Sequence, residues 1–336
     1  MLMPGLPPRA ALLWAKLDLY YQNGSRATSD QGVYLHHIQI HNLDAKRVRK
    51  AYCFGEWASM GRPTEIFLSA GASDYEPGFY FTDPAGKLNS GYLTGDEKER
   101  YLMNGEVVNY RNERIEVYPT VEIEYMPSIP KGCMESTIML FSVTGCTAQN
   151  PTLELLPGPG VKAWNITSDP FPLPEEGLIL NALGHIHDGG TRVESFLNGK
   201  PVCDSKAIYG NPATAVHDHL GDNQETVVSM TECSDIIPVK KGDAIKLVAH
   251  YDLNKHPARA MAGEHSHEMM SQMGVQTMYF AAKKPSSIVN WSPELGGDVA
   301  SAPVVAPAAA GPVAPAPRPA ADDDAEEDDD RRSRRE

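Results

Sequence analysis

The sequence predicts an all-β protein, because glycine and proline supply 55 of its 336 residues (28 and 27) and long stretches with helical apolar periodicity are few. This composition favours short strands joined by turns over a helical bundle. The length fits two sandwich-sized domains. No apolar run approaches the length of about 18 residues that a membrane-spanning helix needs, so no transmembrane segment is predicted.

The first predicted domain comprises residues 25–160. Strands are expected at 32–40, 113–125 and 136–144, where β-branched, alternating or continuous apolar runs lie between turn residues. One short helix is expected at 94–103.

A proline-rich segment separates the two predicted domains. Residues 154–177 contain five prolines, too many for an interior strand, and the linker is placed at 161–177. The second domain is expected at residues 178–290. Its predicted strands are 178–187, 191–197, 226–230, 244–251 and 275–282.

Residues 295–336 are predicted to form a disordered tail. A proline- and alanine-rich stretch without periodicity precedes blocks of like charge, which cannot bury enough apolar surface to offset the entropy of ordering. The net charge is −14, of which the last 36 residues contribute −4 (5 Arg against 9 Asp and Glu), leaving −10 for the rest. Such acidity argues against nucleic acid or anionic membrane as a partner.

The five cysteines contain no Cys-x-x-Cys pair, which excludes a cysteine-clamped zinc ribbon or a thioredoxin-type motif. They fit buried thiols in a cytosolic protein or a sparse disulfide set in a secreted one. Sequons at Asn23, Asn165 and Asn290 favour a secreted glycoprotein, whereas the N-terminal residues do not read as a signal peptide. Secretion is therefore slightly favoured, and a cytoplasmic location stays open.

Cys203 and Cys233 are the candidate disulfide pair. They are 30 residues apart and lie at the ends of segments that sheet pairing could bring together. Cys133 and Cys146 flank the run at 136–144, and one straight strand would hold them apart, so no bridge is expected there.

Histidines give the strongest indication of chemistry. His185 and His187 alternate along a predicted strand, so both imidazoles project from one face and can reach one metal ion. The alternative is two strand histidines that face solvent. His36 and His37 are adjacent, so they can bind one ion only where a bulge or twist turns them together. Otherwise one histidine is buried and the other exposed.

Methionines follow the last histidine cluster. Met269 and Met270 come directly after His265 and His267, before the strand predicted at 275–282. A thioether is a soft ligand that suits copper(I). The alternative is a core edge in which methionine fills irregular gaps.

These motifs, in this order, resemble the copper type II, ascorbate-dependent monooxygenases, a group that includes the peptidylglycine and dopamine monooxygenases. The likeness is closer to the stress-up-regulated nodulin family of plants and fungi. The first likeness rests on YLHHI, on the His-x-His motif and on the Glu-Met-Met that precedes Met-Tyr-Phe. The closer likeness rests on GHIHDGGTRVESFLNGKPVCDSKAIYG and SMTECSDIIPVKKGD. The resemblance covers about residues 30–285 and implies two tandem, antiparallel, jelly-roll-like β-sandwiches with one copper ion in each, facing across a solvent cleft.

The resemblance also implies ligands. In the second domain it assigns the dioxygen-binding copper to His185, His187 and Met269, with Met270 as the alternative methionine. In the first domain it assigns an electron-transfer copper to His36, His37 and a third histidine further along the chain.

The first ligand set is incomplete by this comparison. No histidine occurs from residue 42 to residue 184. His41 is a poor substitute, because four residues of strand span about 13 Å. One copper ion per chain is therefore expected, bound through His185 and not through His37.

Three functions stay open on the sequence. The first is a copper-dependent monooxygenase that oxidises a C–H bond of a small-molecule or peptide substrate with dioxygen. The second is a non-catalytic, stress-related or secreted binding protein that keeps the fold and part of the ligand set. The third is a zinc hydrolase that uses His185, His187 and His250.

Overall fold

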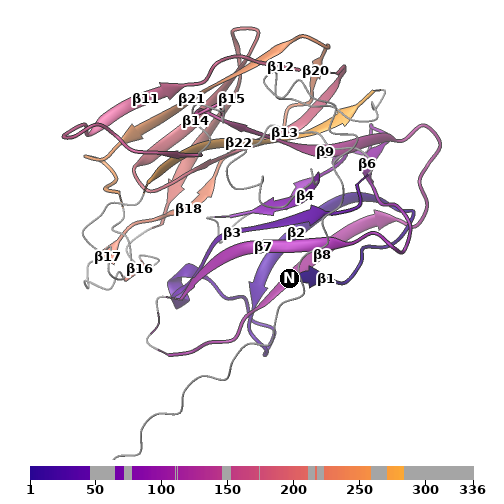
Figure 1. Cartoon of the computed structure of the whole chain (residues 1–336), viewed down its shortest axis with the longest axis horizontal. Helices are drawn as coiled ribbons and strands as arrows, with labels where there is room; N and C mark the ends of the chain where they lie inside the picture. Colours follow the sequence, from indigo (N-terminus) through magenta and orange to yellow (C-terminus); the bar gives the residue numbers. More distant parts are fainter. Residues whose placement is uncertain are drawn as a thin grey trace, which may run out of the picture. The chain divides into compact units, whose positions relative to one another are not determined.

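The computed structural model describes residues 1–45, 65–71, 78–109, 111, 113–145, 153–173, 175–210, 225–258 and 271–283, and the backbone of 216–217 and 223–224. Over these residues the fold is all-β, as predicted: strands, a single 3-10 turn and no α-helix (Figure 1). No described helix is long and apolar enough to cross a membrane. The tail predicted at 295–336 and Asn290 lie outside the described residues.

The first half of the chain forms a small sheet and part of a larger one. Its elements are β1 (Leu2–Met3), β2 (Ala11–Tyr20), η1 (Ser29–Gln31), β3 (Val33–Asn42), β4 (Glu65–Ala70), β5 (Phe79–Tyr80), β6 (Ser90–Leu93), β7 (Tyr101–Asn109), β8 (Tyr118–Met126) and β9 (Met134–Ser142). A four-stranded sheet has the order β1-β7-β3-β4. Its central strand β3 buries Val33, Leu35, Ile38 and Ile40 in the core.

The second half contributes the remaining strands. They are β10 (Glu154–Leu155), β11 (Ala163–Thr167), β12 (Phe171–Pro172), β13 (Gly177–Ile186), β14 (Gly190–Leu197), β15 (Lys200–Tyr209), β16 (Val216–His217), β17 (Asn223–Gln224), β18 (Val227–Met230), β19 (Glu232–Cys233), β20 (Ile237–Val239), β21 (Ala244–Asp252) and β22 (Gln272–Ala282). Five of them form a sheet in the order β11-β21-β14-β15-β18, which β12 joins through β21.

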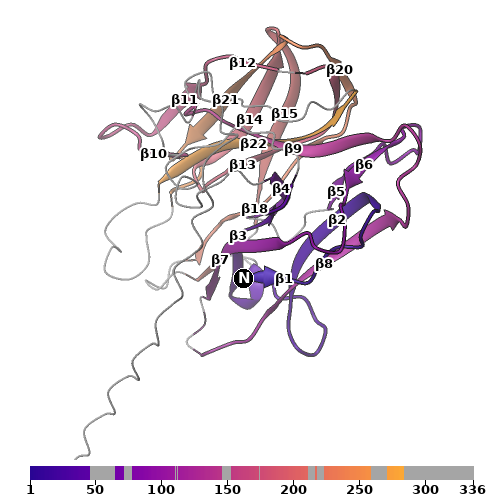
Figure 2. The same cartoon turned by 45° about the vertical axis from the view of Figure 1, so that its right-hand side comes forward.

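One sheet joins the two halves of the chain. Its order is β19-β13-β22-β9-β6-β2-β5, so β9 of the first half pairs with β22 of the second (Figures 1 and 2). The β9–β22 ladder is antiparallel and runs from Glu135 opposite Ala282 to Ser142 opposite Val275. Backbone hydrogen bonds of this ladder therefore connect the segments that the sequence assigns to separate domains.

The segment predicted as a linker contains strand residues. β11 and β12 both lie within residues 161–177 and pair with β21. β11 is an edge strand of its sheet. Prolines are tolerated at a sheet edge, because a missing backbone N–H that would face solvent removes no hydrogen bond between strands. The division of the chain at this segment stays a prediction.

The helix predicted at 94–103 is wrong. Residues 94–100 form turns and loops, and Tyr101 begins strand β7. Tyr101 and Met103 are both buried, which is the period of a strand. The polar residues before them stabilise the turn, in which the Glu99 carboxylate accepts a hydrogen bond from the Gly95 N–H (2.8 Å).

Cys203 and Cys233 form a disulfide, with Cα atoms 5.6 Å apart. The bridge lies beside β13, because Cys233 pairs with Ala182 in the β13–β19 ladder. Cys133 is a free thiol, and Cys146 lies outside the described residues. The sequon residues Asn23 and Asn165 are both exposed, while glycosylation and location stay predictions.

Candidate metal centre

A β-bulge brings His36 and His37 to the same point. Along an unbroken strand, adjacent side chains project from opposite faces. In β3 the pairing with β7 shifts register between Leu35 and His37, so His36 is the extra residue of a bulge. The two Nδ1 atoms lie 2.9 Å apart and the ring centroids 5.0 Å apart.

This geometry corrects one expectation from the sequence. His36 and His37 are both partly buried, so the expected combination of one buried and one exposed histidine is wrong. Two nitrogens bound to one ion at about 2.0–2.1 Å each stand about 2.8–3.4 Å apart at tetrahedral or square angles. The measured separation of 2.9 Å falls in this range. This separation is compatible with one shared ion and equally with a hydrogen bond between the two rings.

His185 and His187 lie at the end of β13. His187 is 7% exposed, and its Nδ1–H donates a hydrogen bond to the Ser271 carbonyl oxygen (2.6 Å). This bond fixes the tautomer and leaves the lone pair on Nε2. That Nε2 is buried and has no hydrogen-bond partner among the described residues. A buried imidazole with one nitrogen anchored and the other lacking a partner is the arrangement of a metal ligand.

Burial and neighbouring imidazoles keep this pair neutral. Desolvation lowers the pKa of His185 well below its usual value, and His187, His36 and His37 lower it further. Desolvation also lowers the pKa of His187, against the opposing effect of the hydrogen bond to Ser271. Both rings therefore carry a free lone pair at neutral pH, the form that binds metal.

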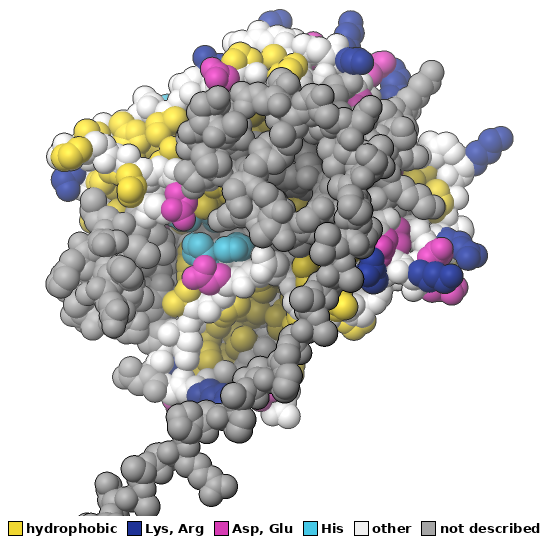
Figure 3. All heavy atoms as spheres, viewed as in Figure 1, with side chains coloured by type: hydrophobic (Ala, Val, Ile, Leu, Met, Phe, Trp, Pro, Cys, Tyr) yellow, Lys and Arg dark blue, Asp and Glu magenta, His cyan; other side chains and the backbone are white. Residues whose placement is uncertain are grey.

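The two histidine pairs line one cavity of about 230 Å³. The ring centroids of His36 and His187 are 5.4 Å apart, and those of His185 and His187 are 5.6 Å apart. On the face of the molecule drawn in Figure 3, histidine side chains lie next to acidic side chains. The other lining residues include Phe79, Asn104, Glu106, Leu140, Leu153, Glu154, Leu183, Met273, Val275 and Thr277.

Packing explains why the pairs meet. One apolar cluster contains Leu35 and Ile38, which flank the first pair, together with Leu183 and Val275 of β13 and β22. Val275 is also the ladder partner of His185. Burying these side chains in one core draws the bulge of β3 toward the end of β13.

The donors of this cavity fit copper. Imidazole nitrogen suits copper, and a thioether such as that of Met273 favours its reduced state. Calcium and magnesium prefer oxygen ligands, whereas four imidazoles line this cavity. The buried Nε2 of His187 provides a defined position for the metal.

Two histidines considered as ligands from the sequence, His41 and His250, do not line the cavity. His41 is fully buried elsewhere along β3 and does not line the cavity, and burial lowers its pKa to about 4. His250, the third ligand of the zinc hydrolase hypothesis, instead lies with its Nε2 2.6 Å from the Glu194 carboxylate. Met269 and Met270 lie outside the described residues, so their role stays a prediction.

The sequence did not indicate Glu106 and Met273. Glu106 lies opposite His37 in the β3–β7 ladder, a pairing across 69 residues that no local pattern reveals. Met273 stands in the methionine-rich stretch that suggested a soft ligand, four residues beyond Met269. The soft-ligand argument therefore applies to Met273 as well, while Met269 lies outside the described residues and stays a prediction.

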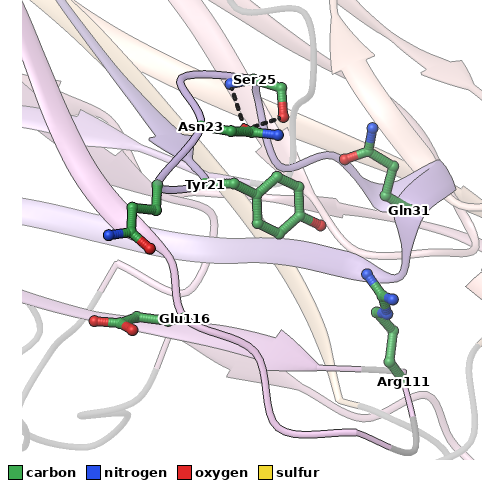
Figure 4. A pocket seen from close by; sticks show the side chains of 7 residues that line it. Tyr21, Asn23, Ser25, Gln31, Arg111 and Glu116 are labelled. Carbon is green, nitrogen blue, oxygen red and sulfur yellow. Dashed lines mark hydrogen bonds between the residues drawn. The ribbon is translucent and has the colours of Figure 1, made fainter.

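A second hollow of about 700 Å³ has different lining residues. Figure 4 shows Tyr21, Gln31, Arg111 and Glu116 around it, with Asn23 accepting hydrogen bonds from the Ser25 N–H (2.9 Å) and hydroxyl (2.7 Å). No histidine, cysteine or methionine of the described part of the chain lines it. The hollow is separate from the histidine cavity.

Comparison with known proteins agrees with this chemistry. The chain is 27% identical over 239 residues to the "Probable copper-dependent oxygenase M1" of Phoma sp. and 26% identical over 242 residues to the "Probable copper-dependent oxygenase clz3" of Cochliobolus lunatus. Each match covers 71% of this chain. The matches cover 56% of the first relative and 70% of the second, so the chain spans little more than half the length of the first.

A family model matches about a third of the chain, most of it in the second half. Residues 159–265 match the family described as "Stress up-regulated Nod 19". The match contains His185, His187 and both cysteines of the disulfide. It also contains the two stretches on which the sequence resemblance rests. The resemblance to the stress-up-regulated nodulin family is therefore confirmed, together with a distant relationship to fungal proteins named as probable copper-dependent oxygenases.

Proposed function

We propose that this protein is a copper-dependent oxygenase whose metal ions are held in the histidine cavity. The observation that carries the proposal is the convergence of His36, His37, His185 and His187 on one cavity. The names of the two fungal relatives support copper as the metal and oxygenation as the reaction.

The two pairs would serve as separate ligand sets. His185 and His187 would hold one ion, with the thioether of Met273, which lines the same cavity, as the soft donor available in the described residues. His36 and His37 would hold the other through their Nδ1 atoms. Copper, when bound, would supply the electron transfer and dioxygen chemistry that oxidise a substrate C–H bond.

The residues of the chain supply binding and orientation. The Ser271 carbonyl anchors the ring of His187, so that its Nε2 keeps one direction and one tautomer. Phe79, Leu140, Leu183 and Val275 form apolar walls that limit water in the cavity. A substrate that enters would therefore present an apolar C–H group to the metal, whether it is a small molecule or a peptide side chain.

Copper content and oxygen consumption test the proposal. Purified protein loaded with copper should retain the metal after dialysis, and it should consume dioxygen with ascorbate in a copper-dependent reaction. His185→Ala should lose one of the two copper ions, while the ion held by His36 and His37 remains, and it should abolish oxygen consumption. His250→Gln is the matched control, because it removes a histidine that bonds Glu194 and does not line the cavity. Retention of two copper ions by both His185→Ala and His37→Ala would refute the proposal.

A further inference from the structure

We propose that Glu106 is a metal ligand, the third donor of the ion held by His36 and His37. Its Oε2 lies 3.5 Å from the His36 Nδ1. Among the described residues, the set of histidine, cysteine and carboxylate side chains whose ligand atoms all lie within 4.8 Å of one another is His36, His37 and Glu106. This inference rests on the proposed function only in naming copper as the ion.

The sheet register holds Glu106 in position. Glu106 is the ladder partner of His37, so β7 carries the carboxylate alongside the bulge of β3. Its side chain is 59% exposed, whereas that of His36 is 13% exposed. The carboxylate can therefore rotate by the small amount needed to close on an ion, while the imidazoles stay fixed by packing.

A surface ion pair does not account for the whole arrangement. A protonated His36 beside Glu106 would explain the 3.5 Å separation of those two residues. A hydrogen bond between the His36 and His37 Nδ1 atoms (2.9 Å) joins the two rings without an ion, and it leaves the ligand atoms of all three residues within 4.8 Å of one another. A cation at the centre of the three groups also explains both separations, because each group then presents a lone pair to the same point.

The carboxylate also replaces a donor that the sequence lacks. The resemblance implies a third histidine for this ion, and none occurs from residue 42 to residue 184. A carboxylate is a harder donor than imidazole, so it stabilises copper(II) relative to copper(I). We therefore expect a lower reduction potential at this ion than three imidazoles would give.

Copper stoichiometry and electron paramagnetic resonance of the whole chain test the role of Glu106. With Glu106 as a third donor, the one ion per chain expected from the sequence is replaced by two in the unaltered protein and one after Glu106→Gln. The affinity for the lost ion should fall by more than the roughly 10–100-fold that follows loss of a residue that only supports a ligand. Glu124→Gln is the matched control, since Glu124 is an exposed strand glutamate that does not line the cavity. Glu106→His should restore the second ion with an altered copper(II) spectrum and a higher potential.

The outcomes separate this inference from the proposed function. Two ions bound with unaltered affinity and spectrum by Glu106→Gln would refute Glu106 as a ligand and leave the copper-dependent function intact. An unaltered protein that binds no copper would refute both. Circular dichroism of the metal-free variants shows whether each has folded, and Glu106→His keeps the test decisive if Glu106→Gln does not fold.

Discussion

Glycine at position 105 is required for the bulge of β3, and Gly105→Ala should disrupt it. A Cβ atom placed on Gly105 would lie 2.3 Å from the His37 carbonyl oxygen and 2.6 Å from the Ile38 Cα. Both are backbone atoms, which cannot move aside as the end of a long side chain can. Restoring an ordinary contact requires β3 and β7 to separate by about 1 Å at the residues that present the His36 and His37 imidazoles.

The cost of this separation follows from overpacking. Inserting one methyl group into a well-packed site costs about 1–3 kcal/mol, and contact with backbone places Gly105→Ala toward the upper end of that range. Alanine also restricts the unfolded chain, which returns about 0.4–1 kcal/mol. We therefore expect the free energy of unfolding to fall by about 2 kcal/mol, together with loss of the ion bound by His36 and His37.

Urea unfolding of the metal-free protein measures the first effect, and copper content measures the second. Gly5→Ala is the matched control, because a Cβ at Gly5 meets nothing within 4 Å. An unfolding free energy for Gly105→Ala equal to that of Gly5→Ala, with copper content unchanged, would show that the close approach at His37 is not required.

Two further predictions concern stability. Replacing Cys203 and Cys233 by alanine should lower the free energy of unfolding by about 3–4 kcal/mol, the loop-closure value for their separation of 30 residues, and a loss below 1 kcal/mol in urea would contradict it. Burial lowers the pKa of His41 to about 4, whereas the pKa of histidine in the unfolded chain is about 6.5. Between about pH 6.5 and pH 4 the unfolded chain therefore binds a proton at His41 that the folded chain does not bind. Stability should therefore fall as the pH falls through this window, and His41→Gln should remove about 3 kcal/mol of the loss between pH 7 and pH 4; equal losses in both proteins would contradict the role of His41.

Local patterns predicted most of what lies within one strand. The alternation of apolar residues located strands close to β3 and β13, and the His-x-His spacing placed His185 and His187 on one face. The helix at 94–103 failed because charged residues resembled a solvent-exposed helix, while the buried Tyr101 and Met103 follow the two-residue period of a strand.

The bulge of β3 could have been predicted from the same alternation. Val33 and Leu35 are buried at odd positions, and Ile38 and Ile40 are buried at even positions. A side-chain period of two changes phase only where a residue is inserted into the strand. The change falls between Leu35 and Ile38, at His36 and His37, so the apolar pattern itself indicates that the two histidines do not alternate.

The shared cavity could not be predicted, because it depends on pairings between distant segments. Glu106 reaches His36 only through the β3–β7 register, and His187 approaches His36 only because β9, β22 and β13 form one sheet. The resemblance implies two sites that face each other across a solvent cleft, whereas here the ring centroids of His36 and His187 are 5.4 Å apart. The hydrogen bonds of the β9–β22 ladder and a common apolar core fix the distance between His36 and His187. The two halves of the chain therefore need not close on each other to bring these two rings together. If electrons pass between the two ions during turnover, the packed rings of His36 and His187 provide the shortest described route between the pairs.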